Sequence, residues 1–322
     1  MPDEPPLHQP HDKLFKASFG DPVNAAAFLC REIPPAVAEK IQWEQLRLQP
    51  GSFIDSQFRH SQSDLLFAAP LADSSCLLYF LFEHQISQDA LLALRLLRYM
   101  VRIWEEWTRN QPGAPLPIIL PIVLAQNAEV WNISPQFSGL LDLPAPLADD
   151  LRPCIPDFTF RLIQLASLPF DSIRGTPAGI MTLRVMKAER LDDLLNHFVW
   201  DEPLFLQLPQ EVRERLLLYI IHWGIDIEAF HRKVQLIANP ELQSTAMSLA
   251  QQLHQKGRQE GRQEGRQEGR QNSVIEALEI RFGHVPAGLA EVIRGINDEA
   301  RLHHLHKAAI QAPNLEAFTA VL

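Results

Sequence analysis

The sequence predicts an α/β fold in the first half of the chain, followed by a helical region. Two observations lead to this prediction. Strand-like stretches, which are apolar in runs or alternate in twos, occur only before about Leu168. Beyond that residue, apolar side chains recur at helical spacing. The 322 residues are also enough for about two domains, because single cores rarely grow further.

The chain begins with two short helices and three strands. Residues 13–30 carry apolar side chains at helical spacing, and Asp21 with Pro22 forms a helix-start signal in the middle. We therefore expect a helix, a break and a second helix, with His11 and Asp12 as caps of the first. Strands are then expected over residues 45–55, 63–69 and 76–85, the last two joined by a polar turn.

The next elements complete the sheet and begin the helical region. A wide apolar stripe predicts a long helix over residues 88–109 that packs on the sheet. The run PIILPIVLA at 117–125 is typical of a central buried strand, and FTFRLIQL at 158–165 alternates like one more strand. Helical patterning follows over residues 181–198, 209–238, 241–255 and 274–322, the last with a break at 283–286.

A four-residue repeat, GRQEGRQEGRQEGR, fills residues 257–270. Each glycine in a helix costs about 1 kcal/mol relative to alanine, so we expect a frayed helix or a flexible tether. The predicted division is a core at 10–168, a helical region at 169–256, the repeat linker at 257–272 and a small helical module at 273–322. The helical C-terminal region is a possible homo-oligomer contact.

Composition limits the possible functions. The net charge of −10 argues against a surface that attracts nucleic acid everywhere, although a local basic groove is compatible with it. The three cysteines lie far apart, which gives neither a disulfide framework nor a zinc spacing. No secretion signal and no apolar run of about 20 residues is present, so we expect a cytoplasmic protein without membrane contact.

The strand at 76–85 ends in polar residues, which marks a candidate site. Alternate side chains of a strand share a face, so Glu83 and Gln85 converge while His84 points to the other face, where a structural role is expected. An antiparallel meander can bring Asp64 of the preceding strand next to them. Two adjacent carboxylates repel each other unless a cation lies between them, and oxygen ligands suit Mg²⁺ or Mn²⁺.

Such a metal would serve phosphodiester hydrolysis, because it polarises a phosphate oxygen and lowers the pKa of a bound water. Arg95, Arg98 and Arg102 on the following helix, and Arg59 in the preceding loop, could neutralise a phosphate. Without further information, two carboxylates at a strand end are more often a solvated edge or an ion pair. The histidines at 303, 304 and 306 are expected on a solvated helix face.

Several segments in order resemble one family, the recombination-promoting nucleases, also called putative transposases, of the PD-(D/E)XK nuclease superfamily. The resemblance covers about 150 residues. The matching segments are HDKLFK at 11–16, FLCREIP at 28–34, SFIDSQFRHSQSDLLF at 52–67, LYFLFEHQIS at 78–87, LRLLRYM at 94–100 and VWN at 130–132.

The resemblance implies a PD-(D/E)XK restriction-endonuclease-like core, a mixed sheet flanked by helices, and Mg²⁺-dependent endonucleolytic cleavage of DNA linked to recombination or mobile elements. It makes Asp64 the metal-binding aspartate and Glu83 the second carboxylate. Gln85 stands where many members of the superfamily have lysine. Tyr99 and Arg95, one helical turn apart, stand where related nucleases often place residues that face the site.

Two other functions remain open. A catalytically decayed member would bind DNA or a protein partner through the same scaffold. Gln85, the turn AQNAEVWN after the strand at 117–125 and the acidic net charge favour this alternative. A transposase that joins DNA strands is a weaker alternative, because the sequence offers no third suitably spaced carboxylate.

Overall fold

The computed structural model describes residues 10–50, 65–72, 77–145, 148–223 and 226–322. The chain divides into two compact units, one of residues 1–247 and one of residues 248–322. The first contains the sheet and the helices around it. The second contains most of the long helix α10 and the C-terminal helices. No helix in the described part of the chain is both long and apolar enough to cross a membrane.

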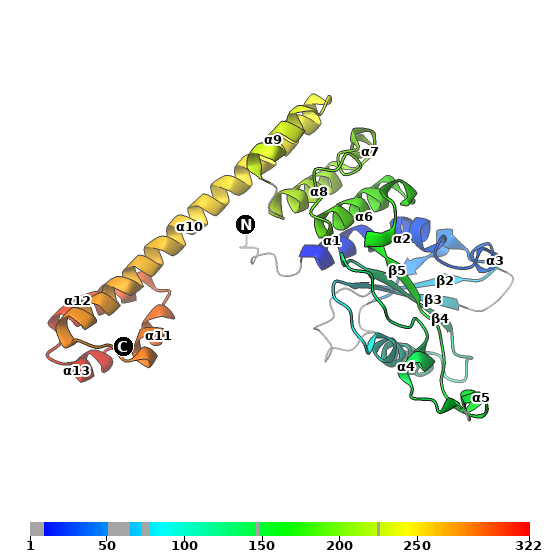
Figure 1. Ribbon diagram of the computed structural model, residues 1–322, viewed down its shortest axis with the longest axis horizontal. Helices are drawn as coiled ribbons and strands as arrows, with labels where there is room; N and C mark the ends of the chain where they lie inside the picture. Colours follow the sequence, from blue (N-terminus) through cyan, green and yellow to red (C-terminus); the bar gives the residue numbers. More distant parts are fainter. Residues whose placement is uncertain (1–9, 51–64, 73–76, 146–147, 224–225) are drawn as a thin grey trace. The chain divides into compact units, whose positions relative to one another are not determined.

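The first unit is built on a five-stranded mixed sheet, which confirms the predicted α/β class (Figure 1). The spatial order of the strands follows the sequence. The first three strands pair antiparallel, and β3, β4 and β5 pair parallel. The strands are β1 (Arg47–Leu48), β2 (Leu65–Pro70), β3 (Leu77–Gln85), β4 (Ile118–Ala125) and β5 (Arg161–Gln164).

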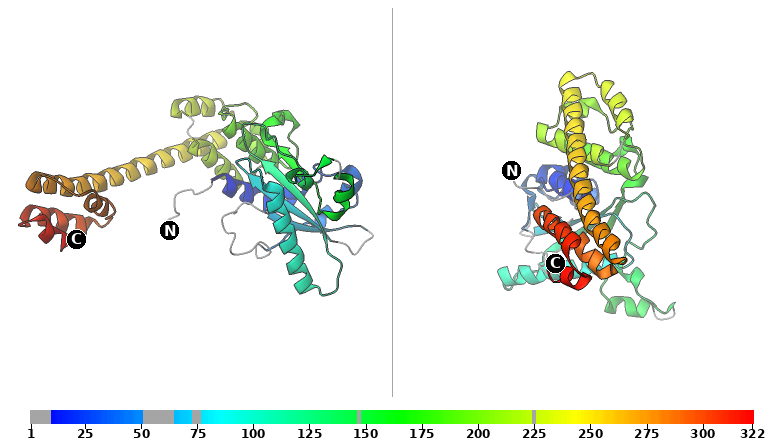
Figure 2. Two further views of the ribbon diagram at one scale, coloured as in Figure 1. Left: turned by 60° about the horizontal axis from the view of Figure 1, so that its bottom comes forward. Right: turned by 90° about the vertical axis from the view of Figure 1, so that its left-hand side faces the viewer.

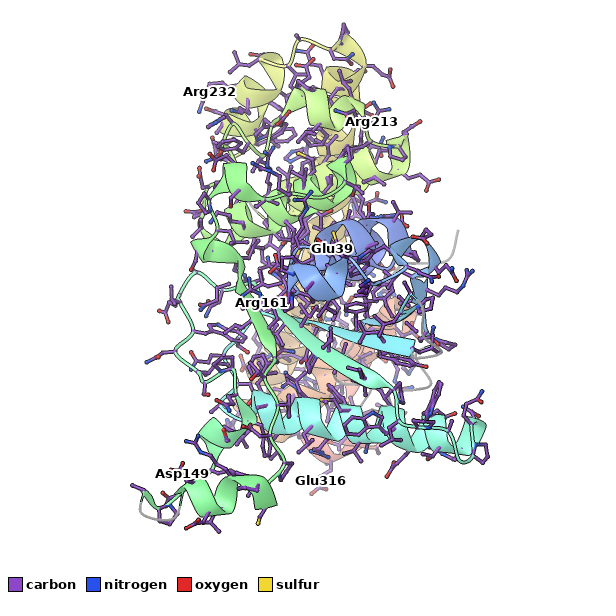
Figure 3. All side chains as sticks on the ribbon, turned by 90° about the vertical axis from the view of Figure 1, so that its right-hand side faces the viewer. Glu39, Asp149, Arg161, Arg213, Arg232 and Glu316 are labelled. Carbon is purple, nitrogen blue, oxygen red and sulfur yellow. The ribbon has the colours of Figure 1, made fainter. Side chains whose placement is uncertain are left out.

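Helices lie on both sides of this sheet: Figure 3 shows the long helix α4 on one side and the N-terminal helices, in blue, on the other. Phe82 of β3 faces α1 (Pro10–Phe19), where its ring lies 4.9 Å from Phe15 and 5.5 Å from Phe19 between centroids. On the opposite face, Leu81 packs in a cluster with Leu96 of α4 (Leu92–Asn110). Adjacent residues of β3 therefore belong to two different cores.

The expected break between the first two helices is confirmed. Helix α2 (Pro22–Leu29) begins after Asp21, whose carboxylate accepts a hydrogen bond from the backbone N–H of Val23. The expectation that His11 and Asp12 cap α1 is wrong, because α1 already begins at Pro10. Asp12 bonds to the His84 ring of β3 at 2.8 Å instead, which is a tertiary contact and has no local sequence signal.

Other helix bounds differ from the expected ones for local reasons. Helix α6 (Pro177–Arg190) begins after Thr176, whose hydroxyl accepts from the N–H of Gly179, and it ends before Asp192, which has a φ of 53°. The expected helix over 209–238 is two helices. The remaining helices of this unit are α3 (Pro35–Ala38), α5 (Ala148–Leu151), α7 (Glu202–Leu206), α8 (Gln210–His222) and α9 (Ile227–Gln235).

Helix α10 (Pro240–Phe282) runs without a break through the repeat, where the sequence predicted a frayed helix or a flexible tether (Figure 2). Before the repeat, Leu242, Ala246 and Ala250 are buried. Near its end, the Gln271 amide donates to the carbonyls of Arg294 and Ile296, both at 2.9 Å. Adding residues to an existing helix is much easier than starting a new one. The packed residues on both sides of the repeat therefore stabilise the helical conformation of the repeat in spite of its glycines.

In the second unit, the C-terminal helices pack against the end of α10. Gly283, with a φ of 74°, ends that helix, which confirms the break expected at 283–286. The buried side chains of the module include Val274, Ile293, Leu305 and Phe318. Its helices are α11 (Ala287–Arg294), α12 (Glu299–Gln311) and α13 (Leu315–Thr319).

Replacing Gly257, Gly261, Gly265 and Gly269 together with alanine is expected to stabilise the repeat. Apart from the neighbouring backbone of the helix itself, no atom lies within 4 Å of a Cβ added at any of the four, and each substitution removes a helix penalty of about 1 kcal/mol. Hydrogen exchange of the repeat amides should therefore slow. Gly283→Ala is the matched control, because its positive φ makes alanine destabilising there. Faster exchange in the fourfold variant would contradict this account.

Candidate functional site

Glu83 is a fully buried carboxylate near the end of β3, with 0% of its surface exposed. It follows the apolar run of the strand and pairs in register with Val123 of β4. Val123 belongs to the core under α4, so Glu83 faces that helix. Burying a carboxylate is unfavourable unless hydrogen bonds or an opposite charge compensate it, and the surroundings of Glu83 supply both.

Gln85 and Arg95 are the partners of this carboxylate. The Gln85 Nε2 donates to Glu83 Oε1 at 2.5 Å, from two residues further along the same face of β3. The Arg95 guanidinium, from the first turn of α4, donates to the same oxygen and with its other terminal nitrogen to Asp89 at 2.5 Å. The structure thus brings together Glu83, Gln85 and Arg95, three of the residues singled out in the sequence.

The two carboxylates keep Arg95 charged. Burial opposes the charged form of the guanidinium, but the charges of Glu83 and Asp89 and the hydrogen bond to Glu83 raise the pKa of Arg95 above its ordinary value. A permanent cation therefore lies against the Glu83 carboxylate. Its positive charge compensates the carboxylates of both Glu83 and Asp89.

A cavity of about 240 Å³ lies along α4 beside these groups. Tyr99, one turn after Arg95, is 3% exposed and contributes to its wall. Three guanidinium groups and the Asp89 carboxylate line the cavity, and guanidinium groups are well suited to bind a phosphate. Its lining residues are Asp89, Leu91, Leu94, Arg95, Arg98, Tyr99 and Arg102.

Asp64 and Arg59 lie outside the described residues. Within the described part, β2 begins at Leu65, which pairs with Phe82, the residue before Glu83. The described residues hold no group of three or more histidine, cysteine, aspartate or glutamate side chains that could bind a metal. Glu83 is of the ligand type that Mg²⁺ and Mn²⁺ prefer, a hard carboxylate oxygen, but a second carboxylate is needed to complete a site.

His84 has a structural environment on the opposite face, as expected. Its side chain is fully buried, it stacks on Phe15 with 5.1 Å between ring centroids, and both ring nitrogens lie 2.8 Å from an oxygen atom. The oxygens belong to Asp12 and to Gln126, the residue after β4. The sequence singled out the turn AQNAEVWN as a whole but not Gln126 within it, because the role of Gln126 depends on contacts between distant elements.

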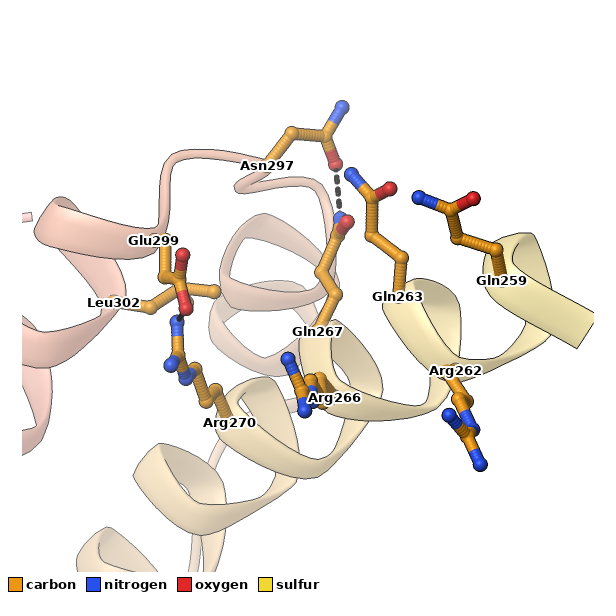
Figure 4. Close-up of a pocket in the computed structure, with 9 residues that line it drawn as sticks. All are labelled: Gln259, Arg262, Gln263, Arg266, Gln267, Arg270, Asn297, Glu299 and Leu302. Carbon is orange, nitrogen blue, oxygen red and sulfur yellow. Dashed lines mark hydrogen bonds and ion pairs between the residues drawn. The ribbon is translucent and has the colours of Figure 1, made fainter.

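A second cavity of about 440 Å³ lies within the C-terminal unit, between the repeat and the start of α12 (Figure 4). The Gln267 amide donates to Asn297 at 2.6 Å, and Arg270 pairs with Glu299. Successive glutamines of the repeat, Gln259, Gln263 and Gln267, line its rim. These contacts fix the second half of the repeat to the C-terminal module but present no arrangement suited to acid–base or metal chemistry.

The family described as "Putative transposase, YhgA-like" matches residues 9–215 of the chain. The chain is 28% identical over 127 residues to recombination-promoting nuclease RpnD of Escherichia coli O157:H7, which covers 38% of this chain and 49% of that protein. It is 27% identical over 186 residues to recombination-promoting nuclease RpnA of Escherichia coli K12, which covers 58% of this chain and 62% of that protein.

A further relative has a different description. The inactive recombination-promoting nuclease-like protein RpnE of Escherichia coli K12 is 30% identical over 114 residues, covering 35% of this chain and 38% of that protein. The chain thus spans about half the length of the first two relatives or slightly more. No solved structure matches the chain.

Proposed function

The chain belongs to the YhgA-like putative transposase family, and we propose that it is a DNA nuclease linked to recombination, with its site at the end of β3. The membership confirms the resemblance found in the sequence motifs. The observation that carries the proposal is the fully buried carboxylate of Glu83 at a strand end, in contact with Gln85 and Arg95 beside an arginine-lined cavity.

In this proposal Asp64 and Glu83 hold Mg²⁺ or Mn²⁺. The support is the pairing of Leu65 with Phe82, since the chain enters β2 next to the strand end that carries Glu83. When bound, the metal would polarise a phosphate oxygen and activate a water molecule. Arg95, Tyr99 and Arg59 are proposed to contact the phosphate. The Gln85 amide holds one Glu83 oxygen through its hydrogen bond.

We further propose that the core is of the PD-(D/E)XK type. The mixed sheet, the helix α4 between β3 and β4 and the carboxylate at the end of β3 agree with that arrangement. A DNA substrate and a cytoplasmic location are part of the same proposal. Homo-oligomer formation through the C-terminal helices stays a prediction.

Plasmid cleavage tests the proposed function. The purified full-length chain should nick or linearise supercoiled plasmid in Mg²⁺ and should leave it intact in the presence of a chelator. Asp64→Ala should abolish cleavage, because one carboxylate is a poor site for a divalent cation. Equal cleavage by the wild-type chain and by Asp64→Ala would refute the assignment of the site.

Gln85→Leu is expected to reduce the cleavage rate about 10-fold to 100-fold, which is the usual effect of losing a side chain that orients a metal ligand. The leucine keeps the size of the side chain but cannot donate to Glu83. Gln85→Lys should retain more activity, because the ammonium group can donate to the same carboxylate oxygen. Cleavage rates measured at saturating Mg²⁺ would check this order, and a fully active Gln85→Leu would show that the amide has no role.

A second candidate is a catalytically decayed protein that binds DNA without cutting it. The specific observation in its favour is that Arg95 forms an ion pair with Glu83, which is also what a purely structural carboxylate would do. The description of one relative as inactive is compatible with it. A mobility shift of plasmid fragments by a chain that does not cut them in Mg²⁺ or Mn²⁺ would favour this candidate.

A further inference from the structure

A buried chain of hydrogen bonds lies behind the candidate site, on the other face of β3. We call it the His84 network and define it as Asp12, His84, Gln126, His11 and Tyr219. It begins at Asp12, whose carboxylate lies 2.8 Å from Nδ1 of His84. On the other side of the ring, Nε2 lies 2.8 Å from Gln126 Oε1. His84 is the residue between Glu83 and Gln85.

The orientation of the Gln126 amide follows from its other contacts. Gln126 is 1% exposed, and its Nε2 lies 2.9 Å from the carbonyl oxygen of Met186 in α6. A carbonyl can only accept, so the amide nitrogen points to Met186 and the amide oxygen to His84. The same nitrogen lies 3.2 Å from Glu189 Oε2 and 3.3 Å from the Tyr219 hydroxyl.

Gln126 also bonds to β3 directly. Its backbone N–H donates to the carbonyl oxygen of Gln85 at 2.8 Å. Its backbone therefore fixes the last residue of β3, and its side chain fixes the residue before it. A displacement of Gln126 would thus be transmitted to the residues on both sides of His84.

His11 forms the far end of the network. Arg190 of α6 contacts its Nε2 at 2.9 Å, and its Nδ1 lies 2.5 Å from the hydroxyl of Tyr219 in α8. Burial and the charge of Arg190 lower the pKa of His11 to about 3, so the ring is neutral. With Nε2 accepting from Arg190, the remaining ring proton is on Nδ1 and is donated to Tyr219.

We propose that His84 and Gln126 are positioning residues, which hold the end of β3 so that Glu83 and Gln85 face α4 and which connect helices α6 and α8 to that end. Successive side chains of a strand point to opposite faces, so fixing the His84 ring on one face fixes Glu83 on the other. Buried hydrogen bonds restrict the side chains that form them to few arrangements, because leaving a buried polar group unpaired is costly. The effect on cleavage rests on the proposed function, whereas the effect on the strand end does not.

This proposal gives two helices after the sheet, α6 and α8, a role in positioning the candidate site. Met186, Glu189 and Tyr219 belong to α6 and α8, and all three contact the Gln126 amide. A role limited to stability would lower the melting temperature without a selective effect on Glu83. A positioning role predicts a change at the end of β3 beyond that caused by an equally destabilising substitution elsewhere.

The test compares His84→Phe and Gln126→Leu with Thr182→Val in the full-length chain. Thr182 of α6 is fully buried and donates to the Ser18 hydroxyl of α1 at 2.8 Å, so its loss also removes a buried hydrogen bond between layers. That bond does not involve β3. Hydrogen exchange at the amides of Glu83 and Gln85 should become at least about tenfold faster in the first two variants and stay unchanged in Thr182→Val.

Mg²⁺ titration and plasmid cleavage give the functional readout. His84→Phe should lose at least about tenfold in Mg²⁺ affinity and Thr182→Val should lose none. If the wild-type chain itself neither binds Mg²⁺ nor cuts DNA, the proposed function fails, while the exchange measurement still decides on positioning. Exchange at the strand end that is equal in all variants, or that rises equally in Thr182→Val, would overturn the inference.

Asp12 provides a second pair of variants in case His84→Phe does not fold. Asp12→Asn keeps an oxygen that can accept from the His84 ring, and Asp12→Ala removes it. Faster exchange at Glu83 and Gln85 is expected in Asp12→Ala and a return towards the wild-type rate in Asp12→Asn. Equal exchange rates in these two variants would contradict a role for the hydrogen bond to Asp12.

Discussion

Glu83→Gln is expected to cut plasmid DNA at least about 100-fold more slowly than the wild-type chain in Mg²⁺. A catalytic metal stabilises the transition state by several kcal/mol, and about 1.4 kcal/mol corresponds to a factor of ten in rate. Glutamine has nearly the same shape as glutamate, so the change removes the charge that would hold the metal and little else. Initial rates of loss of the supercoiled plasmid would measure the effect.

Two controls separate a catalytic defect from a folding defect. Glu39→Gln makes the same chemical change at an exposed residue and should leave the rate unchanged. The far-ultraviolet circular dichroism of Glu83→Gln should match that of the wild type, because Arg95 still has the Asp89 carboxylate as a partner. A folded Glu83→Gln variant with the wild-type rate would remove Glu83 from the site.

Arg95→Met is expected to destabilise the chain by up to about 3 kcal/mol in the absence of divalent metal. It leaves the buried Glu83 carboxylate without its cation, and breaking a buried ion pair from one side has costs of this order. Mg²⁺ should restore much of the loss, because a ligand that binds only the native state stabilises it. Thermal unfolding with and without Mg²⁺ would measure both effects.

The metal affinity gives this prediction a second readout. Removing the guanidinium also removes a competing cation, so Arg95→Met should bind Mg²⁺ at least as tightly as the wild type does, although it cuts more slowly. Arg109→Met is the matched control, because Arg109 is 70% exposed and its pair with Glu106 should contribute less than about 1 kcal/mol. Destabilisation by Arg95→Met that Mg²⁺ does not reduce would argue for a purely structural ion pair.

The sequence was informative where a local pattern determines the structure. The alternation of β3 correctly placed Glu83 and Gln85 together and His84 on the other face, because side-chain direction in a strand has a period of two. Asp21 and Pro22 correctly marked the start of α2. Arg95 and Tyr99, which the family resemblance singled out, both lie on the wall of one cavity.

The sequence was not informative where contacts between distant elements decide. Gln126 follows a strand directly, and only the arrangement of α6, α8 and β3 brings three acceptors, on Met186, Glu189 and Tyr219, to its amide nitrogen. The repeat has poor intrinsic helix propensity, yet it is helical because the residues on either side of it are packed. Helix propensity, which is a local property, could not predict these tertiary contacts.

Calorimetric titration of Mg²⁺ into the wild-type chain and Asp64→Ala tests the central claim most directly, namely that Asp64 and Glu83 together form a metal site. The account predicts a binding event in the wild type that is lost in Asp64→Ala, in a variant with an unchanged circular dichroism spectrum. Mg²⁺ binding of equal affinity in both proteins, or none in the wild type, would contradict it.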